Sequence, residues 1–297
     1  MAHIQFFCDK HYGGYGDRLV GMASALTIAR ALGATMTFQW ESEFMQLCGA
    51  PPSPVTTPDL THLNLINQRR SDILETQNLR ELWSNQTVRI SANIPIDRLL
   101  WSNPHFSLGD YQAEAIRSFR EVMPCLGLPH PNPKYEFGIQ IRCGDTYCMP
   151  HAAAEQYIPE ASWPDFAKRV RAYLVDRGVQ GGVYLTSDTY KIYPVFKALN
   201  DETLQFVTID RTSDVHFDFY NSNGRYKEIV ADHVELQSCK RIITGLRSNF
   251  GATAAYCSNV CDEMILYDRE FKTFDPRTTL VLKEFPDEAD GVRSMLK

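Results

Sequence analysis

The sequence predicts an α/β protein made of two Rossmann-like, doubly wound domains that face each other across a cleft. In the second half, short apolar runs alternate with segments of helical periodicity, an order that produces a parallel sheet with helices on both faces. The first half opens with the same strand–helix–strand order. Three prolines between positions 129 and 133 separate the halves, because proline ends helices and central strands. We therefore expect domains at 1–128 and 134–297.

The composition is that of a soluble globular protein and argues against several partners. The 297 residues carry a formal net charge of −6, so nucleic acid is not expected as a partner. No apolar run approaches the roughly 18 residues of a membrane span, and the N-terminus lacks a signal-peptide pattern. The eight cysteines form no paired CxxC motif, which argues against zinc and for a reducing compartment. We expect a cytoplasmic protein or an excised soluble catalytic domain.

The first half begins with a strand–turn–helix–strand unit. A strand at Ile4–Cys8 leads into a glycine-rich turn at 9–18, a helix to Leu32 and a strand at Thr35–Trp40. Leu19 stands where a dinucleotide-binding loop would have its third glycine, so we reject that fingerprint. The glycines either form the turn or let the backbone approach a ligand closely.

The remaining elements follow from apolar periodicity. Residues 41–110 are the least regular part, and we expect short strands at 63–66 and 88–90 with a short helix at 78–83. A clear amphipathic helix is predicted at 111–123. In the second half we expect Ser162 to cap a helix that has Pro164 in its first turn. The predicted strands are 137–142, 183–188, 204–209, 241–244 and 263–267, and the predicted helices include one ending at Leu199, 225–239 and 250–257.

An arginine follows the most regular of these strands. The run 137–142 indicates a strand buried on both faces, with Arg142 at its carboxyl end and Gly144 and Asp145 in the tight turn that follows. Ligands bind at the carboxyl ends of parallel strands, where strand order reverses. The planar, charged guanidinium of arginine suits a diphosphate. The alternative is an Arg142–Asp145 salt bridge that only braces the turn.

Two further strand ends carry polar residues. Asp188 ends one strand, where it either accepts hydrogen bonds from a ligand or caps the next helix. Ser248 lies in a turn that joins a strand to a helix, where backbone N–H groups and the helix dipole suit a phosphate. The alternative there is a capping box formed with Asn249.

Four motifs, in this order, resemble the fucosyltransferase superfamily of α-1,2, α-1,6, protein O- and nodulation fucosyltransferases. Gly14 to Leu19 resembles its Gly-x-Gly-Asn-Arg-Leu opening, and Gln140 to Asp145 its His-x-Arg-x-Gly-Asp hallmark. Tyr184 to Asp188 resembles the strand ending in Ser-Asp, and Asp232 to Phe250 the last motif. The likeness covers most of the chain.

The resemblance implies a GT-B fold, GDP-fucose as donor, inversion at the anomeric carbon, and neither metal nor cofactor. It implies that Arg142 holds the β-phosphate and stabilises the leaving group, while Asp232 accepts hydrogen bonds from guanine. Ser248 would bind phosphate. The other residues expected to bind the donor nucleotide sugar are Gly14, Gly16, Arg18, Gln140, Asp188, Arg247 and Asn249.

The motifs also depart from the family pattern. Gln140 replaces the family's histidine, Asp17 its asparagine, and Arg247 one of its paired serines. These changes leave open another nucleotide-linked deoxysugar as donor. They also leave open a non-catalytic module that binds a nucleotide sugar or a glycan.

The expected chemistry is direct displacement by a hydroxyl of a glycan acceptor. A general base would take the hydroxyl proton, and the candidates are Asp145, His151, Glu155, Asp17 and His11. Of these, His151 has a suitable intrinsic pKa. Acceptor contacts are expected from residues 41–110, whose sequence does not identify the acceptor.

Overall fold

The computed structural model describes residues 2–8, 14–40, 42–48, 61–68, 70–106, 111–143, 158–211, 226–246, 248–267, 274 and 276–282. The chain divides into two compact units between Pro129 and His130. This division lies inside the proline-rich segment of the sequence. Each unit has its own sheet.

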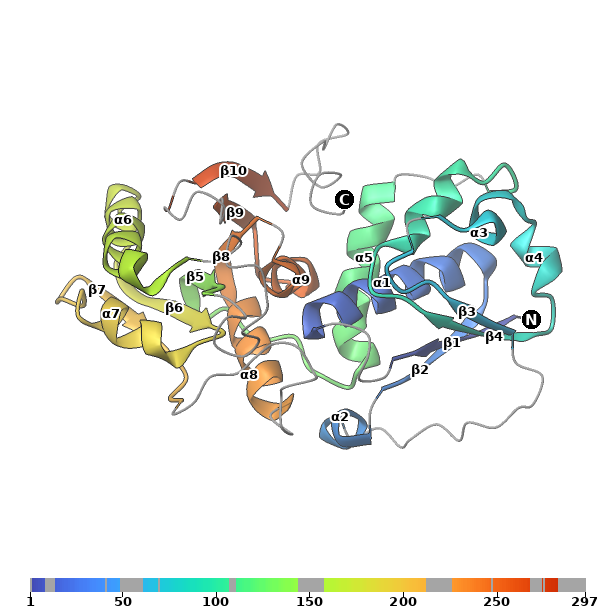
Figure 1. Ribbon diagram of the computed structural model, residues 1–297, viewed down its shortest axis with the longest axis horizontal. Coiled ribbons are helices and arrows are strands. Elements are labelled where there is room, and N and C mark those ends of the chain that lie inside the picture. Colours follow the sequence, from blue (N-terminus) through green and yellow to red (C-terminus); the bar gives the residue numbers. More distant parts are fainter. Residues whose placement is uncertain are drawn as a thin grey trace. The chain divides into compact units, whose positions relative to one another are not determined.

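The N-terminal unit is built on a four-stranded parallel sheet of order β2-β1-β4-β3. Its elements, in chain order, are β1 (His3–Phe7), α1 (Tyr15–Leu32), β2 (Thr35–Gln39), α2 (Ser42–Leu47), β3 (Thr61–Asn64), α3 (Asp72–Thr76), α4 (Leu79–Leu82), β4 (Thr87–Ser91), the 3₁₀ helix η1 (Ile96–Ser102) and α5 (Tyr111–Cys125). Helices α1 and α5 pack against each other and lie over the same side of the sheet (Figure 1).

Helix α1 is almost entirely buried, and two glycines fix its position. Gly33 ends it in the left-handed conformation, with φ 62°, which favours glycine. Gly21 lies against the chain after β4, where an added Cβ would come within 1.8 Å of the Ala92 carbonyl oxygen. Glycine at position 21 therefore allows α1 to approach the sheet more closely than a larger residue at that position would.

The C-terminal unit has a six-stranded sheet of order β10-β9-β8-β5-β6-β7, parallel except for the edge strand β10. Its elements are β5 (Tyr135–Ile141), η4 (Glu160–Ser162), α6 (Trp163–Asp176), β6 (Gly181–Ser187), η5 (Tyr190–Ile192), α7 (Tyr193–Lys197), β7 (Leu204–Val207), α8 (Tyr226–Gln237), β8 (Cys239–Gly245), α9 (Asn249–Cys257), β9 (Glu263–Tyr267) and β10 (Pro276–Val281). Helices α6 and α7 cover one face, and α8 and α9 cover the other (Figure 1).

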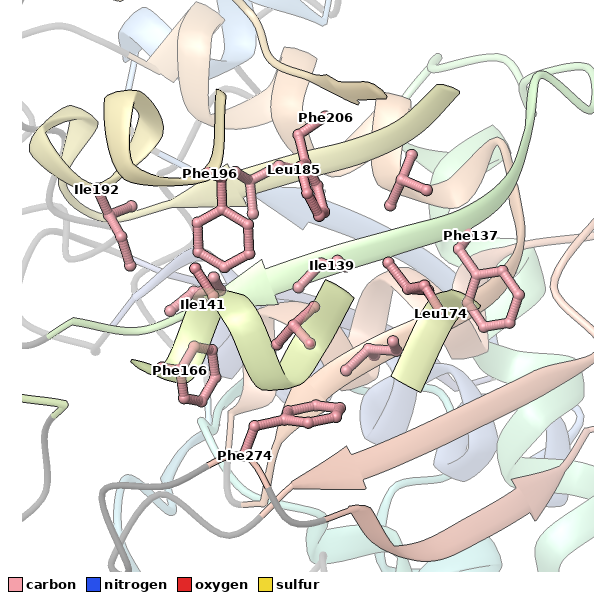
Figure 2. Packing of buried hydrophobic residues seen from close by; sticks show 14 of the residues in the cluster. Phe137, Ile139, Ile141, Phe166, Leu174, Leu185, Ile192, Phe196, Phe206 and Phe274 are labelled. Carbon is pink, nitrogen blue, oxygen red and sulfur yellow. The ribbon is translucent and has the colours of Figure 1, made fainter. Parts of the chain in front are cut away.

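The two faces of this sheet differ in chemistry. On the α6–α7 face, alternate residues of β5 join a buried apolar cluster in which Ile139 and Ile141 meet Phe166 and Phe196 (Figure 2). On the α8–α9 face, Gly138 lets α8 approach, since an added Cβ would lie 2.7 Å from a methyl group of Leu236. The period of two along β5 thus places an apolar core on one face and leaves the other for polar groups.

Two local expectations need correction, and several short elements were not expected. Helix α1 starts at Tyr15, so Gly16 lies in its first turn and not in the preceding loop. The Ser162 side chain makes no capping hydrogen bond, because η4 runs into α6 and leaves Ser162 in a helical conformation, with φ −93° and ψ −10°. The short elements α2, α3 and η1 and the edge strand β10 had no clear periodicity in the sequence, and the sequence did not predict them.

Candidate nucleotide-sugar site

The strand order of the C-terminal sheet reverses at β5. From β5 the chain proceeds through β6 to β7 on one side, and then crosses to β8 and β9 on the other. The helices that follow β5 and β8 therefore cover opposite faces of the sheet, and in such sheets ligands bind at the carboxyl ends of these strands. Arg142 directly follows β5, and Ser248 closes the turn after β8. Both residues lie where the sequence predicted a ligand site.

The turn that carries Arg142 is fastened to the end of β6. The backbone N–H of Cys143 donates to Asp188 Oδ1 at 2.8 Å, and the Ser187 hydroxyl donates to the same oxygen at 3.1 Å. Asp188 is buried. It therefore positions the backbone beside Arg142. Capping of η5 falls to Thr189, whose hydroxyl oxygen accepts from the Lys191 N–H.

A row of polar side chains crosses the α8–α9 face of the sheet. Thr186, Gln140 and Thr244 are register partners on β6, β5 and β8. Gln140 Oε1 accepts one hydrogen bond from Thr244 and one from Ser248, each at 2.8 Å. These two donors orient the amide, and Gln140 Nε2 is buried without an acceptor among the described residues.

Helix α9 approaches this row very closely. An added Cβ on Gly251 would lie 2.1 Å from the Thr244 hydroxyl oxygen, so glycine is required there. Ser248 precedes the first residue of α9, yet its hydroxyl bonds Gln140 and makes no capping bond. The positive end of the α9 dipole thus lies beside the buried amide of Gln140.

Asp232 of α8 lies over the same polar row and is fully buried. Its Oδ1 accepts from the Tyr184 hydroxyl at 2.8 Å, and its Oδ2 accepts from Thr186 at 2.9 Å. Burial raises the pKa of Tyr184 well above its usual value, so that hydroxyl stays protonated and remains a donor. Asp232 also forms a buried ion pair with Arg211, which donates to the Ser187 carbonyl oxygen at 3.1 Å.

The fold of nearly the whole chain resembles that of a solved structure. The structure resembles a mutant of FUT1 from Arabidopsis thaliana in complex with GDP, with a TM-score of 0.57 and 12% identity over 92% of this chain and 71% of that chain. The chain has the GT-B fold, with two Rossmann-like units. This confirms the fold class implied by the sequence motifs. No protein-family model and no curated protein matches the sequence.

Two further likenesses have lower TM-scores. NodZ α-1,6-fucosyltransferase soaked with GDP-fucose aligns with a TM-score of 0.47 and 14% identity over 94% of this chain and 99% of that chain. POFUT1 in complex with GDP aligns with a TM-score of 0.47 and 8% identity over 89% and 98% of the two chains.

The predicted site residues fall into three groups. The structure gathers five of them at the carboxyl edge of the C-terminal sheet: Gln140, Arg142, Asp188, Ser248 and Asn249. Asp232 lies beside them on α8. Asp145, His151 and Arg247 lie outside the described residues, as do the alternative bases His11 and Glu155.

The third group belongs to the N-terminal unit. Gly14 precedes α1, and its N–H donates to Asp17 Oδ2 at 3.1 Å, so Asp17 caps the helix. Arg18 is fully buried, with its guanidinium carbon 5.7 Å from the centre of the Trp40 ring. These contacts account for the local form of the glycine motif. The roles of Gly14, Gly16 and Arg18 toward a donor stay predictions.

Sequence reasoning missed several groups that complete the site. Thr186 and Thr244 each stand one residue before the last of an apolar strand, as does Gln140, and this shared position was a usable signal. Arg211 had no such signal, because its partner lies on a different element 21 residues later along the chain.

None of the helices in the described ranges is long and apolar enough to cross a membrane. Within the same part of the chain, no cluster of three or more His, Cys, Asp or Glu side chains is placed to bind a metal ion.

Proposed function

We propose that this protein is an inverting glycosyltransferase that moves L-fucose from GDP-fucose to a hydroxyl of a glycan acceptor. One observation carries the proposal: Arg142 follows the central strand at the switch point of the sheet, on a turn fixed by the Asp188–Cys143 hydrogen bond. A cation in this position fits the diphosphate of a nucleotide sugar. The fucosyltransferase-type fold and the order of the motifs support GDP-fucose as the donor.

In the proposed reaction, the acceptor oxygen forms a bond to C1 of the sugar while the bond from C1 to the β-phosphate oxygen breaks. GDP leaves with the bonding electrons, and the configuration at C1 inverts. Arg142 stabilises the negative charge that develops on the phosphate. The N-terminal end of α9 adds its partial positive charge. Because these groups supply positive charge, we expect no requirement for a divalent metal.

The acceptor proton goes to a general base, for which Asp145 and His151 remain our candidates. Both follow Arg142 closely in the sequence. We propose that Gly14, Gly16 and Arg18 contribute to donor binding and that residues 41–110 contact the glycan.

One observation favours a different sugar nucleotide as the donor substrate. Gln140 replaces the histidine of the resembled motif, and Asp232, which would accept from guanine, is paired with Arg211. Both changes concern groups expected near the nucleotide. A glycosyltransferase that uses another nucleotide-linked deoxysugar is therefore the runner-up.

The test is calorimetric binding of GDP to wild type and to Arg142→Ala, first with EDTA and then with magnesium. Loss of the charge-assisted hydrogen bonds should weaken binding by roughly tenfold to a hundredfold, equally in both buffers. Arg169→Ala is the matched control, because Arg169 is exposed on α6 of the same unit. Binding of UDP or dTDP in preference to GDP would leave the fold intact and reject the donor.

Hydrolysis of GDP-fucose without acceptor provides a second readout. A transferase should release fucose slowly through attack by water, and Arg142→Ala should suppress that release. Binding without any sugar release, with or without a panel of glycan acceptors, would instead support a non-catalytic module.

A further inference from the structure

The ion pair between Arg211 and Asp232 limits the hydrogen bonds that the Asp232 carboxylate can accept from a ligand. Both side chains are 1% exposed, so neither charge is shared with solvent. Asp232 Oδ1 accepts from Tyr184, and Oδ2 accepts from Thr186 and lies against the Arg211 guanidinium. One oxygen of the carboxylate, Oδ2, is therefore already occupied by two donors, and the other, Oδ1, by a third.

Guanine is recognised by a carboxylate in a specific way. The base presents two adjacent donors, the N1–H and the N2 amino group, and a carboxylate binds them with both oxygens side by side. A carboxylate that is paired with a guanidinium cannot offer both oxygens in this arrangement. Arg211 must leave Asp232 before the N2 amino group of guanine can be read there.

The buried polar atoms without a partner at the Arg211–Asp232 pair are hydrogen-bond donors. Gln140 Nε2 and Arg211 Nε are both buried and have no acceptor among the described residues. They flank the same group, because Thr186, which donates to Asp232, is the register partner of Gln140. Buried donors without acceptors are unfavourable, so a ligand that supplies acceptor atoms completes this part of the structure.

We propose that Arg211 determines the base specificity of the site by occupying Asp232, so that the nucleotide is held through acceptor atoms and its N2 amino group is not read. This inference rests on the proposed function, namely that the site binds a nucleoside diphosphate. The carbonyl oxygen of guanine and that of hypoxanthine meet the requirement equally. The enzyme therefore accepts both bases.

The experiment compares the affinities of GDP and IDP, which differ by the N2 amino group. Wild type should bind the two within about threefold of each other. Arg211→Met frees the carboxylate and should raise the preference for GDP over IDP to roughly tenfold or more, the value of a hydrogen bond to a charged group. Gln140→Met should weaken both nucleotides equally, because the donor that it removes faces an acceptor common to both.

Two controls separate this effect from misfolding. Arg211→Met with Asp232→Asn removes both charges, so it should fold and bind GDP and IDP about equally. Arg171→Met breaks the partly exposed Arg171–Asp201 pair of the same unit and should leave the GDP-to-IDP ratio unchanged. Circular dichroism checks the fold of each variant.

The outcomes distinguish this inference from the proposed function. A wild-type preference for GDP of tenfold or more would overturn the role of Arg211 and leave the glycosyltransferase proposal standing. A folded Arg211→Met variant with an unchanged ratio would overturn it as well. If wild type binds no nucleoside diphosphate, the proposed function itself fails, and this inference fails with it.

Discussion

Asp188, which follows β6, accepts a hydrogen bond from the backbone N–H of Cys143, which follows β5, at 2.8 Å. The bond joins two turns that are 45 residues apart in sequence and adjacent at the sheet edge. It fixes the backbone directly after Arg142. A charged acceptor in a buried position makes this bond stronger than an ordinary one.

The first prediction concerns Asp188. Asp188→Ala removes the acceptor, so the turn loosens and GDP binding should weaken by about tenfold. Asp188→Asn keeps an oxygen for the Cys143 N–H and should retain more of the affinity than alanine does. Calorimetry gives both values, and Asp210→Ala, at an exposed carboxylate of the same unit, is the control. Equal loss in the alanine and asparagine variants would argue against a positioning role.

Gly251 tests the close approach of α9 to the sheet. Gly251→Ala places a Cβ 2.1 Å from the Thr244 hydroxyl oxygen, so α9 must move and the Gln140–Ser248 bond must lengthen. We expect the free energy of unfolding to fall by roughly 1–3 kcal/mol, measured by urea denaturation. Gly182→Ala on β6 should be nearly neutral, since its Cβ would meet neighbours no closer than 3.4 Å.

The burial of His233 predicts that the stability of the protein depends on pH. It is buried between α8 and α9, with Gln237 and Thr253 as partners, and burial lowers its pKa from 6.5 to about 3. Between these values the unfolded chain binds a proton that the folded chain does not. Stability should therefore be highest above pH 6.5 and fall by roughly 2 kcal/mol between pH 6.5 and 5.

The measurement for His233 is the urea midpoint at several pH values. His233→Gln should reduce the fall below pH 6.5, whereas His105→Gln, at an exposed histidine, should not alter it. An identical pH profile in wild type and His233→Gln would contradict the prediction.

Asp97, in the N-terminal unit, should make stability depend on pH in the opposite direction. It is fully buried and accepts from the Ser24 hydroxyl at 2.8 Å, and burial raises its pKa above 3.8. As pH rises above 3.8, the unfolded chain releases this proton first, so stability falls until the folded carboxyl has also ionised. Asp97→Asn imitates the protonated form and should be more stable than wild type at pH 7.

Thermal or urea denaturation at pH 4 and pH 7 checks Asp97. The advantage of Asp97→Asn should shrink toward pH 4, where the wild-type carboxyl is more protonated. Asp72→Asn, at an exposed residue of α3, should show no such trend. A variant less stable than wild type at pH 7 would show that the ionised carboxylate is needed there.

Much of the architecture follows from local patterns. Strands β5, β6 and β8 were predicted to within two residues at each end, because buried parallel strands read as continuous apolar runs. The position of Arg142 after β5 followed directly, since strand ends and turns are encoded by neighbouring residues. Elements with weak periodicity, such as η1 and β10, were missed for the same reason.

The sequence by itself determined the two α/β halves, the strands whose ends form the site and the arginine that follows the central one. Only the tertiary structure decided which polar groups meet there: Asp188 with the Cys143 backbone, Gln140 with Ser248, and Arg211 with Asp232. Periods of two and 3.6 residues are local properties of a chain. Hydrogen bonds and ion pairs between separate elements depend on how helices pack onto a sheet, which no local period encodes.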